Sequence, residues 1–454
     1  MEGFARLIGA AFVAVALGAP LAFGALSVAP AARPGPATAT APAPSPAAPP
    51  VEISDDIAAF YRDRDFQPLW LAGNGFAPEA VQLMRLLGND ADGELRAAIR
   101  AARNRDPHRL TRADILLSRA YVAHLQALHR PPAANTMRYI DPGLEPAARS
   151  GREILDGAAR APSLADQLTE AERINPVYDG LRKGLAGFRG TDQQRRLILA
   201  NMERARAIPA RPHGRYILVD AASARLWMIE DGRIAGAMRV VVGKRAMPSP
   251  VMAGLIRYAA LNPVWNLPPD LIRKRARGGA RAIRAEHLQA LSDWSPQARL
   301  LDPGKVDWRA VAAGRRLVNL RQTPGPHNMM GRIKFMMPND LGVYLHDTPL
   351  RDLLAQADRH ESSGCVRLED APRLARWLFY DRVPRASGAA EQRADLPMPV
   401  PVYIGYFTAL PSRDGIVFQR DVYRRDPGAE RRRPAASAPA RHAVNHRPRR
   451  ARRA

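Results

Sequence analysis

The chain has 454 residues, 46% of them hydrophobic and 25% charged, which is typical of two or three folded domains and excludes a chain that is disordered throughout. Lys and Arg outnumber Asp and Glu by 68 to 44, a net charge of +24. Eleven arginines and two acidic residues lie among Pro and Ala at 424–454, which predicts a basic disordered tail. Because no helix-turn-helix, zinc-ligand spacing or aromatic-basic strand motif is present, we expect no nucleic-acid partner.

An almost unbroken apolar run at 7–28 follows Arg6 and precedes small residues at 29–32. This pattern predicts a secretory signal peptide at 1–29. The run is also long enough for an uncleaved membrane anchor, and a buried core helix is a third alternative. The first two alternatives place the rest of the chain outside the cytoplasm. Residues 30–50 are rich in Pro and Ala and predict an extended linker.

Residues 51–210 predict a helical domain. Apolar periodicity indicates a short helix at 55–61 and a longer one after Pro78, a residue that suits a first helical turn. Another helix is expected to begin at Thr111, and Thr191 is expected to cap the last one.

From 211 to 423 the sequence changes to short runs rich in β-branched and aromatic residues, which predict a mainly β domain. Asp231-Gly232 is a hairpin turn signal, and helices are expected after Pro349 and after Asp370. Residues 267–323 interrupt the strands with basic sequence of helical and loop character. The expected strands lie at 216–219, 225–229, 237–242, 255–261, 333–337, 342–346, 402–407 and 416–423.

Cys365 is the only cysteine of the chain and lies in the sequence SSGCVR at 362–367, nineteen residues after His346. A thiol and an imidazole in such contexts are the parts of a thiolate acyl-transfer enzyme. Gly364 permits a sharp turn at which the N–H groups beside the sulfur converge on an oxyanion. The alternatives are a buried inert thiol and a metal site that also uses Asp347 and His360, but a recognisable ligand spacing is lacking. His124 and His129 likewise lack accompanying ligands, so a structural or surface role is favoured.

This constellation resembles the L,D-transpeptidases, which cross-link peptidoglycan with a YkuD-type catalytic domain. The usual family pattern has a His before the Gly-Cys pair, and Ser363 stands there in this chain, as in the large periplasmic subclass with an SSGCVR motif. The resemblance runs from about 215 to about 424, with a weaker extension toward the N-terminus. The other motifs that carry it are VVGK (241–244), NPVWNLPP (262–269), PGPHN (324–328), GRIKF (331–335), NMERAR (201–206) and FQPLW (66–70).

The resemblance implies an α+β protein without a cofactor or metal. A helical scaffold domain at 51–210 would precede a mainly β YkuD-like catalytic sandwich at 211–423, with a capping subdomain inserted at 267–323. The basic residues of that insert, among them Arg273, Lys274, Arg275 and Arg277, belong either to a lid over the site or to a solvated face.

The resemblance also implies roles for single residues. Cys365 would be the nucleophile, His346 its base, and the N–H groups of Gly364 and Cys365 the oxyanion donors. Asp347 would orient the imidazole through its carbonyl, with its carboxylate as the alternative. Four residues are expected to bind substrate: Ser363, Arg367, Asn328 and Tyr344. For Arg367 the alternative is an ion pair with Glu369 or Asp370, and His360 is expected at the rim of the site.

The expected reaction joins a donor tetrapeptide to an acceptor stem peptide by a 3→3 cross-link, through a thioester, in the periplasm of a Gram-negative bacterium. An inner-membrane anchor, a role in cell shape and inhibition by carbapenems belong to the same expectation. The alternatives are carboxypeptidase hydrolysis, attachment of proteins to peptidoglycan, and a non-catalytic wall-binding scaffold.

Overall fold

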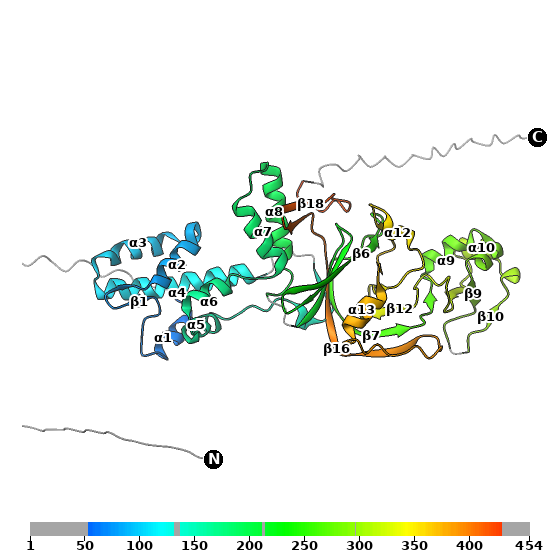
Figure 1. Ribbon diagram of the computed structural model, residues 1–454, viewed down its shortest axis with the longest axis horizontal. Coiled ribbons are helices and arrows are strands. Elements are labelled where there is room, and N and C mark those ends of the chain that lie inside the picture. The colour runs from blue at the N-terminus through cyan, green and yellow to red at the C-terminus, as the bar shows by residue number, and fades with distance from the viewer. Residues whose placement is uncertain (1–52, 131–136, 211–213, 296, 429–454) are drawn as a thin grey trace, which may run out of the picture. The chain divides into compact units, whose positions relative to one another are not determined.

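The computed structural model describes residues 53–130, 137–210, 214–295 and 297–428 (Figure 1). The predicted signal peptide or anchor, the linker and most of the basic tail lie outside these residues. Among the described helices, none combines the length and the apolar character needed to cross a bilayer. The predicted domain boundaries remain predictions.

The N-terminal half of the described chain is helical, as expected, and the helices α1 to α6 share one hydrophobic core that includes Trp70 and Tyr121. Short strands interrupt it at β1 (Leu71–Ala72), β2 (Gly75–Phe76) and β3 (Arg138–Tyr139). The helices are α1 (Asp55–Arg62), α2 (Pro78–Leu87), α3 (Gly93–Ala101), α4 (Pro107–His129), α5 (Gly151–Arg160), α6 (Leu164–Ala171), α7 (Pro176–Ala186) and α8 (Asp192–Ala205).

Three of the predicted helix starts in this half are confirmed, among them Asp55 of α1, and one is wrong. Pro78 begins α2, and Thr191 caps α8 with a capping box completed by Gln194. The helix expected from Thr111 begins at Pro107 instead. Its cap is Asp106, whose carboxylate accepts the Arg109 N–H at 2.9 Å. The Asp106 cap accepts a free N–H of the first turn, and Pro107 has no N–H that needs an acceptor, so the helix starts four residues earlier than predicted.

The β half is built on one mixed sheet in the order β12-β13-β15-β6-β5-β4-β16-β7-β3. Because β12 also pairs with β7, the sheet closes around a single core of inward-facing side chains. Its strands are β4 (Arg215–Asp220), β5 (Arg225–Glu230), β6 (Arg233–Gly243), β7 (Met252–Leu261), β12 (Ile333–Met336), β13 (Leu345–His346), β15 (Val366–Leu368) and β16 (Gln392–Gly405), and β14 (His360–Ser362) pairs with β6.

The expected hairpin at Asp231-Gly232 is confirmed, with φ values of 48° and 75°. Helices follow at α12 (Asp352–Ala355) and α13 (Ala371–Leu378), as predicted. Two strands are shorter than predicted. Only Leu345–His346 of the 342–346 segment pairs with other strands, and the last strand, β18 (Gly415–Phe418), pairs with β17 (Ala409–Ser412) and ends before 423.

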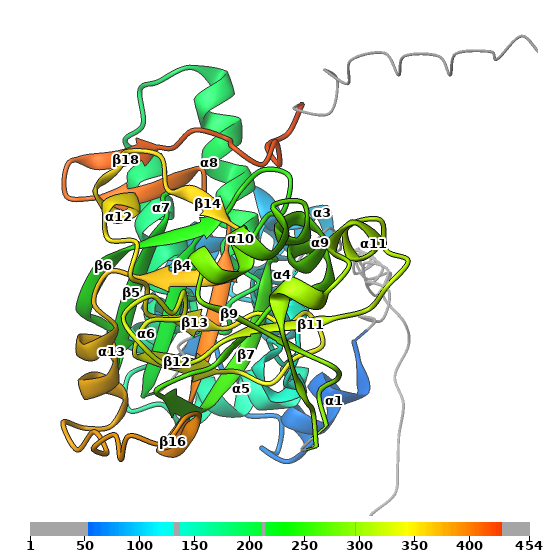
Figure 2. The same ribbon diagram turned by 90° about the vertical axis from the view of Figure 1, so that its right-hand side faces the viewer.

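The insert at 267–323 contains most of a second sheet, in the order β10-β9-β11-β8, that has its own core. Figure 2 shows its helices and strands at the end of the molecule that faces the viewer. Tyr344, the residue before β13 of the closed sheet, packs against this core. The elements are β8 (Trp265–Asn266), α9 (Pro269–Ala276), α10 (Gly279–Ala285), β9 (Leu288–Leu291), β10 (Leu300–Leu301), α11 (Trp308–Ala312) and β11 (Asn319–Gln322).

Candidate active site

His346 lies on the outer face of the closed sheet. Its neighbour Leu345 is buried in the core on the other side, because successive side chains of a strand alternate. Pairing places His346 beside Lys334 of β12 and beside Arg367 of β15. The register of three short strands therefore places an imidazole between two cations.

The imidazole of His346 is buried, with 2% of the residue exposed. Its Nδ1 contacts the backbone carbonyl of Asp347 at 2.5 Å. Since a carbonyl only accepts, Nδ1 carries the proton and Nε2 is left with a lone pair. Burial, together with the charges of Arg367 and Lys334, lowers the pKa of His346 to about 3, and the hydrogen bond to the Asp347 carbonyl only partly opposes this shift. The ring is neutral at pH 7 and able to accept a proton.

The carboxylate of Asp347 has other partners, so the carbonyl is the group that orients the imidazole. Its Oδ2 accepts the Arg332 N–H at 2.9 Å, and its Oδ1 pairs with Arg351 at 2.7 Å. The side chain of Asp347 thus fixes the backbone that holds His346.

Cys365 is half-buried, and its Sγ lies 3.6 Å from the carbonyl oxygen of Gly342. Burial raises the pKa of the thiol, while hydrogen bonds from Tyr344 and the charges of Arg367 and Lys334 oppose that rise. Within the described residues no hydrogen bond joins Sγ to the imidazole. A proton transfer between them therefore needs the thiol to rotate toward Nε2 as substrate binds.

The turn that carries Cys365 is held by Ser362, a buried residue that the sequence did not single out. Its hydroxyl donates to the Cys365 carbonyl at 2.6 Å and accepts the Gly364 N–H at 3.1 Å. Gly364 has φ 117°, a conformation open to glycine, as expected. Its predicted oxyanion role needs correction, because its N–H already has an acceptor. The N–H of Cys365 has no hydrogen-bond partner among the described residues.

The four predicted substrate-binding residues do not share one environment. Tyr344 lies beside His346, with ring centroids 5.6 Å apart, and interacts with Cys365. Ser363 is exposed in the turn. Asn328 is buried, and its amide is hydrogen-bonded to the loop carbonyls of Pro263 and Thr323. Asn328 therefore holds a loop and has no free group for substrate.

Arg367 is the best placed of the four. The alternative ion pairs do not form, because Glu369 pairs with Arg239, and Asp370 lies nearest Arg373. In the part of the chain that is described, Nε of Arg367 is buried without a hydrogen-bond partner. A half-buried guanidinium beside the thiol, with an Nε that lacks a partner among the described residues, is suited to bind a carboxylate.

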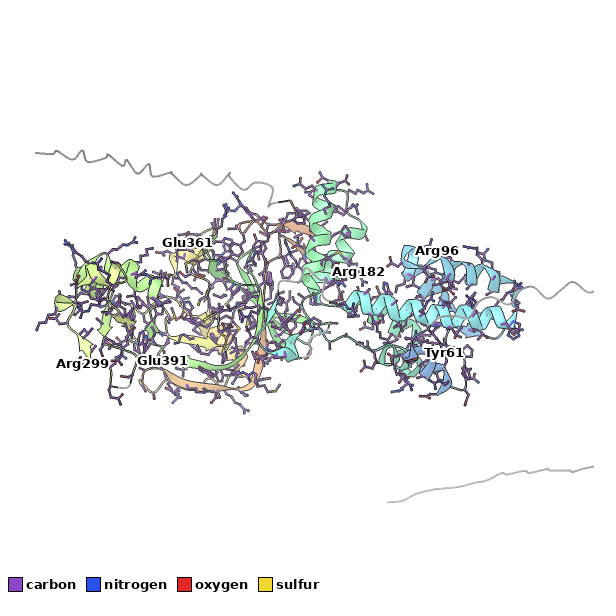
Figure 3. All side chains as sticks on the ribbon, turned by 180° about the vertical axis from the view of Figure 1, so that it is seen from behind. Tyr61, Arg96, Arg182, Arg299, Glu361 and Glu391 are labelled. Carbon is purple, nitrogen blue, oxygen red and sulfur yellow. The ribbon has the colours of Figure 1, made fainter. Side chains whose placement is uncertain are left out.

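Lys334 was missed at the sequence level. Its ammonium is largely buried and pairs with Glu391 at 2.8 Å, and Glu391 is labelled in Figure 3. The alternation of GRIKF placed Lys334 on the face opposite Ile333 and Phe335, but only the strand register shows that His346 shares that face.

The other histidines considered in the sequence have different hydrogen-bond partners, and that of His129 is the Ala171 carbonyl, at 2.9 Å. His360 contacts Asp358 through Nδ1 at 2.6 Å and the Ala221 carbonyl through Nε2 at 2.9 Å. His124 pairs with Glu172. Among the described residues no cluster of three or more His, Cys, Asp or Glu side chains could hold a metal.

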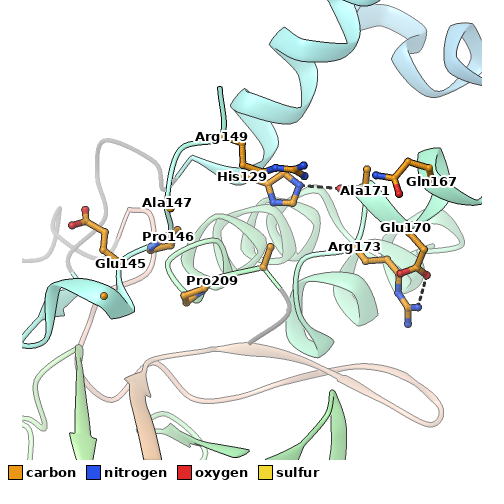
Figure 4. A pocket seen from close by; sticks show the side chains of 12 residues that line it. His129, Glu145, Pro146, Ala147, Arg149, Gln167, Glu170, Ala171, Arg173 and Pro209 are labelled. Carbon is orange, nitrogen blue, oxygen red and sulfur yellow. Dashed lines mark hydrogen bonds and ion pairs between the residues drawn. The ribbon is translucent and has the colours of Figure 1, made fainter. Parts of the chain in front are cut away.

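Two cavities lie away from the sulfur. One, of about 860 Å³, is lined by Asp347, Gly331 and the 383–386 region, but not by Cys365 or His346. The other, of about 430 Å³, lies between α4, α6 and neighbouring loops, with His129, Arg149 and Glu170 in its wall (Figure 4). The thiol therefore lies outside both cavities.

Comparison with protein families matches two parts of this chain. Residues 214–402 match the YkuD L,D-transpeptidase catalytic domain, and residues 55–185 match the family described as Scaffold domain. A curated protein of Haemophilus influenzae named "Putative L,D-transpeptidase" is 30% identical over 273 residues, which are 57% of this chain and 55% of that protein. The chain thus spans about half the length of this relative.

Solved structures give a weaker similarity. An L,D-transpeptidase from Mycobacterium smegmatis is 17% identical, with 42% of this chain and 58% of that chain covered and a TM-score of 0.22. The catalytic domain of an Enterococcus faecium L,D-transpeptidase is 16% identical, with 42% and 97% covered and a TM-score of 0.21. At these TM-scores the structural similarity adds nothing to the family match.

Proposed function

We propose that this chain, whose residues 214–402 match the YkuD L,D-transpeptidase catalytic domain, forms 3→3 cross-links between peptidoglycan stem peptides through a thioester on Cys365. The observation that carries the proposal is the neutral, buried His346, whose proton sits on the nitrogen held by Asp347. That arrangement leaves Nε2 free to act as the base for the only thiol of the chain.

In the first half-reaction Nε2 of His346 takes the Sγ proton as sulfur attacks the carbonyl carbon of the third stem residue. The developing oxyanion accepts a hydrogen bond from the Cys365 N–H, in a site where such a donor is worth about 3 kcal/mol. When the tetrahedral intermediate collapses, the imidazolium returns its proton to the leaving amine of the terminal D-Ala. The product is a thioester.

In the second half-reaction the side-chain amine of an acceptor stem attacks the thioester carbon. His346 takes the amine proton and returns it to sulfur when the C–S bond breaks. Arg367 is placed to bind a substrate carboxylate, since its Nε is buried beside Cys365 and has no partner within the described residues. The chemistry balances without a metal or cofactor.

The acceptor distinguishes this function from its alternatives. Water would give a carboxypeptidase, and a protein amine would give attachment of that protein to the wall. The insert favours transfer over hydrolysis if it acts as a lid, and the packing of Tyr344, beside the thiol, against the core of the insert supports that role. We place the reaction in the periplasm, on the basis of the apolar N-terminal run.

The test is to incubate the purified chain with disaccharide-tetrapeptides and to analyse the products by liquid chromatography and tandem mass spectrometry. We expect 3→3 dimers in excess over tripeptide monomers, and neither product from Cys365→Ala. Tripeptides without dimers would replace transpeptidation by hydrolysis. Dimers that still form with Cys365→Ala would rule out a mechanism through a thioester on Cys365.

A further inference from the structure

Ser249 lies in the loop between β6 and β7 and is 0% exposed. Its hydroxyl donates to the Gly364 carbonyl at 2.7 Å and accepts the Gly243 N–H at 2.9 Å. The hydroxyl therefore joins the end of β6 to the turn that carries the thiol, although the two are more than a hundred residues apart in sequence.

The carbonyl that Ser249 holds belongs to the same peptide unit as the N–H of Cys365. In a trans peptide these two groups point in opposite directions. A carbonyl fixed toward Ser249 therefore directs the Cys365 N–H to the other side of the turn. A hydrogen bond to the carbonyl also polarises the peptide and makes its N–H a stronger donor.

The loop that carries Ser249 is itself held closely. The Ser249 N–H lies 3.4 Å from the Tyr423 hydroxyl, which in turn donates to the Gly243 carbonyl. A Cβ on Gly243 would lie 2.3 Å from the Met247 carbonyl oxygen, so the chain packs there without room for a side chain. The Tyr423 ring stacks on Tyr406 with centroids 4.9 Å apart. Ser249 is thus a fixed donor and not a mobile one.

The hydrogen bond that Ser362 accepts makes the position of the Cys365 N–H important. Because the Ser362 hydroxyl accepts the Gly364 N–H, that donor is occupied, whereas the Cys365 N–H has no partner among the described residues and stays available for an oxyanion. We propose that Ser249 is a positioning residue, which aims and strengthens that N–H without touching substrate. This inference rests on the proposed acyl-transfer function.

The test compares two reactions of the same sulfur in Ser249→Ala. Acylation by a carbapenem passes through an oxyanion, whereas alkylation by iodoacetamide does not. We expect the acylation rate constant to fall roughly 10- to 100-fold, less than the 10²- to 10³-fold typical for loss of a whole donor. The alkylation rate and its pH profile should stay within about twofold of the unchanged protein.

Two further variants control the test. Ser118→Ala removes a serine that is equally buried and bonded to Tyr61 and Trp70 in the helical half, and it should change neither reaction. Tyr423→Phe keeps the Ser249 hydroxyl but loosens its loop, so a smaller loss of acylation is expected, and this variant decides the matter if Ser249→Ala does not fold.

Three outcomes would overturn the inference. Acylation of Ser249→Ala at the unchanged rate would remove the positioning role. A parallel fall of acylation and alkylation would make Ser249 a structural residue only. If the unchanged protein reacts with iodoacetamide but not with any carbapenem or tetrapeptide, the proposed function itself fails, which the first two outcomes do not imply.

Discussion

The resting protonation state follows from two side chains and their surroundings. Burial lowers the pKa of His346 to about 3 and raises the pKa of the Cys365 thiol. Both shifts favour the neutral forms, so the pair rests as thiol and imidazole and not as an ion pair. The proton must then move during the attack on the carbonyl, which makes the orientation of Nε2 decisive.

The neutral state of His346 predicts a pH dependence of stability. The pKa of His346 in the folded chain lies below the ordinary histidine value of 6.5, so as the pH falls the unfolded chain binds this proton first. The stabilising contribution is fully present above 6.5 and is lost as the pH falls toward 3. Urea unfolding between pH 7 and pH 4 should show a steeper loss of stability for the unchanged protein than for His346→Gln. Parallel curves would contradict the burial of a titrating imidazole.

Substitution of His346 and of His360, one at a time, should distinguish the general base from a histidine with a structural role. His346→Ala removes the base and should slow carbapenem acylation by at least about 100-fold, as general-base removal does. His360→Ala loses contacts to Asp358 and Ala221 and should lower the melting temperature with little change in acylation. Stopped-flow fluorescence measures both rates, and a larger loss at His360 would move the base there.

At the scale of elements, short sequence motifs predicted the turns and helix starts that depend on neighbouring residues alone. The predictions of the hairpin at Asp231-Gly232 and of the helix starts at Pro78 and Thr191 were correct, because each depends on residues within one turn. The start of α4 was missed although Asp106-Pro107 carried a stronger signal than Thr111. The 419–423 segment is not a strand because side-chain bonds hold it, such as Tyr406 to Asp421 at 2.8 Å.

The loop between the insert at 267–323 and β12 contains Gly331, whose backbone conformation leads to a prediction about stability and acylation. Gly331 has φ 61°, and a Cβ there would lie 2.3 Å from Oδ2 of Asp347. Gly331→Ala must therefore displace the carboxylate that bonds Arg332 and Arg351. We expect a loss of about 1–3 kcal/mol in unfolding free energy and slower acylation, because the Asp347 carbonyl moves with it. Gly314→Ala, also at positive φ but in open space, is the matched control and should leave acylation unchanged.

At the scale of the whole molecule, Cys365 and His346 were predictable because each lies in a distinctive short sequence. Lys334, Ser362 and Ser249 were not singled out, because strand register and turn packing bring them to the site. Asn328 was assigned to substrate from a motif, yet loop carbonyls occupy its amide. Sequence thus pointed to the thiol and the imidazole that we propose as the reacting groups, while the residues that set their orientation required the fold.

Tyr344 connects the insert at 267–323 to the thiol, because it packs on the core of the insert and interacts with Cys365. Replacing 267–323 with a short linker should leave iodoacetamide alkylation measurable, slow acylation, and lower the ratio of cross-linked to hydrolysed product. A second variant keeps the insert and converts the exposed Arg273, Lys274 and Arg277 to Gln. An unchanged ratio in both would make the insert a spacer with a solvated basic face.

The most direct measurement of the central claim is intact-protein mass spectrometry of the chain after incubation with a tetrapeptide donor and no acceptor. The account predicts a mass increase equal to the donor less its terminal D-Ala, localised by peptide mapping to Cys365 and absent from Cys365→Ala. An adduct on another residue, or turnover of the donor by Cys365→Ala, would contradict it.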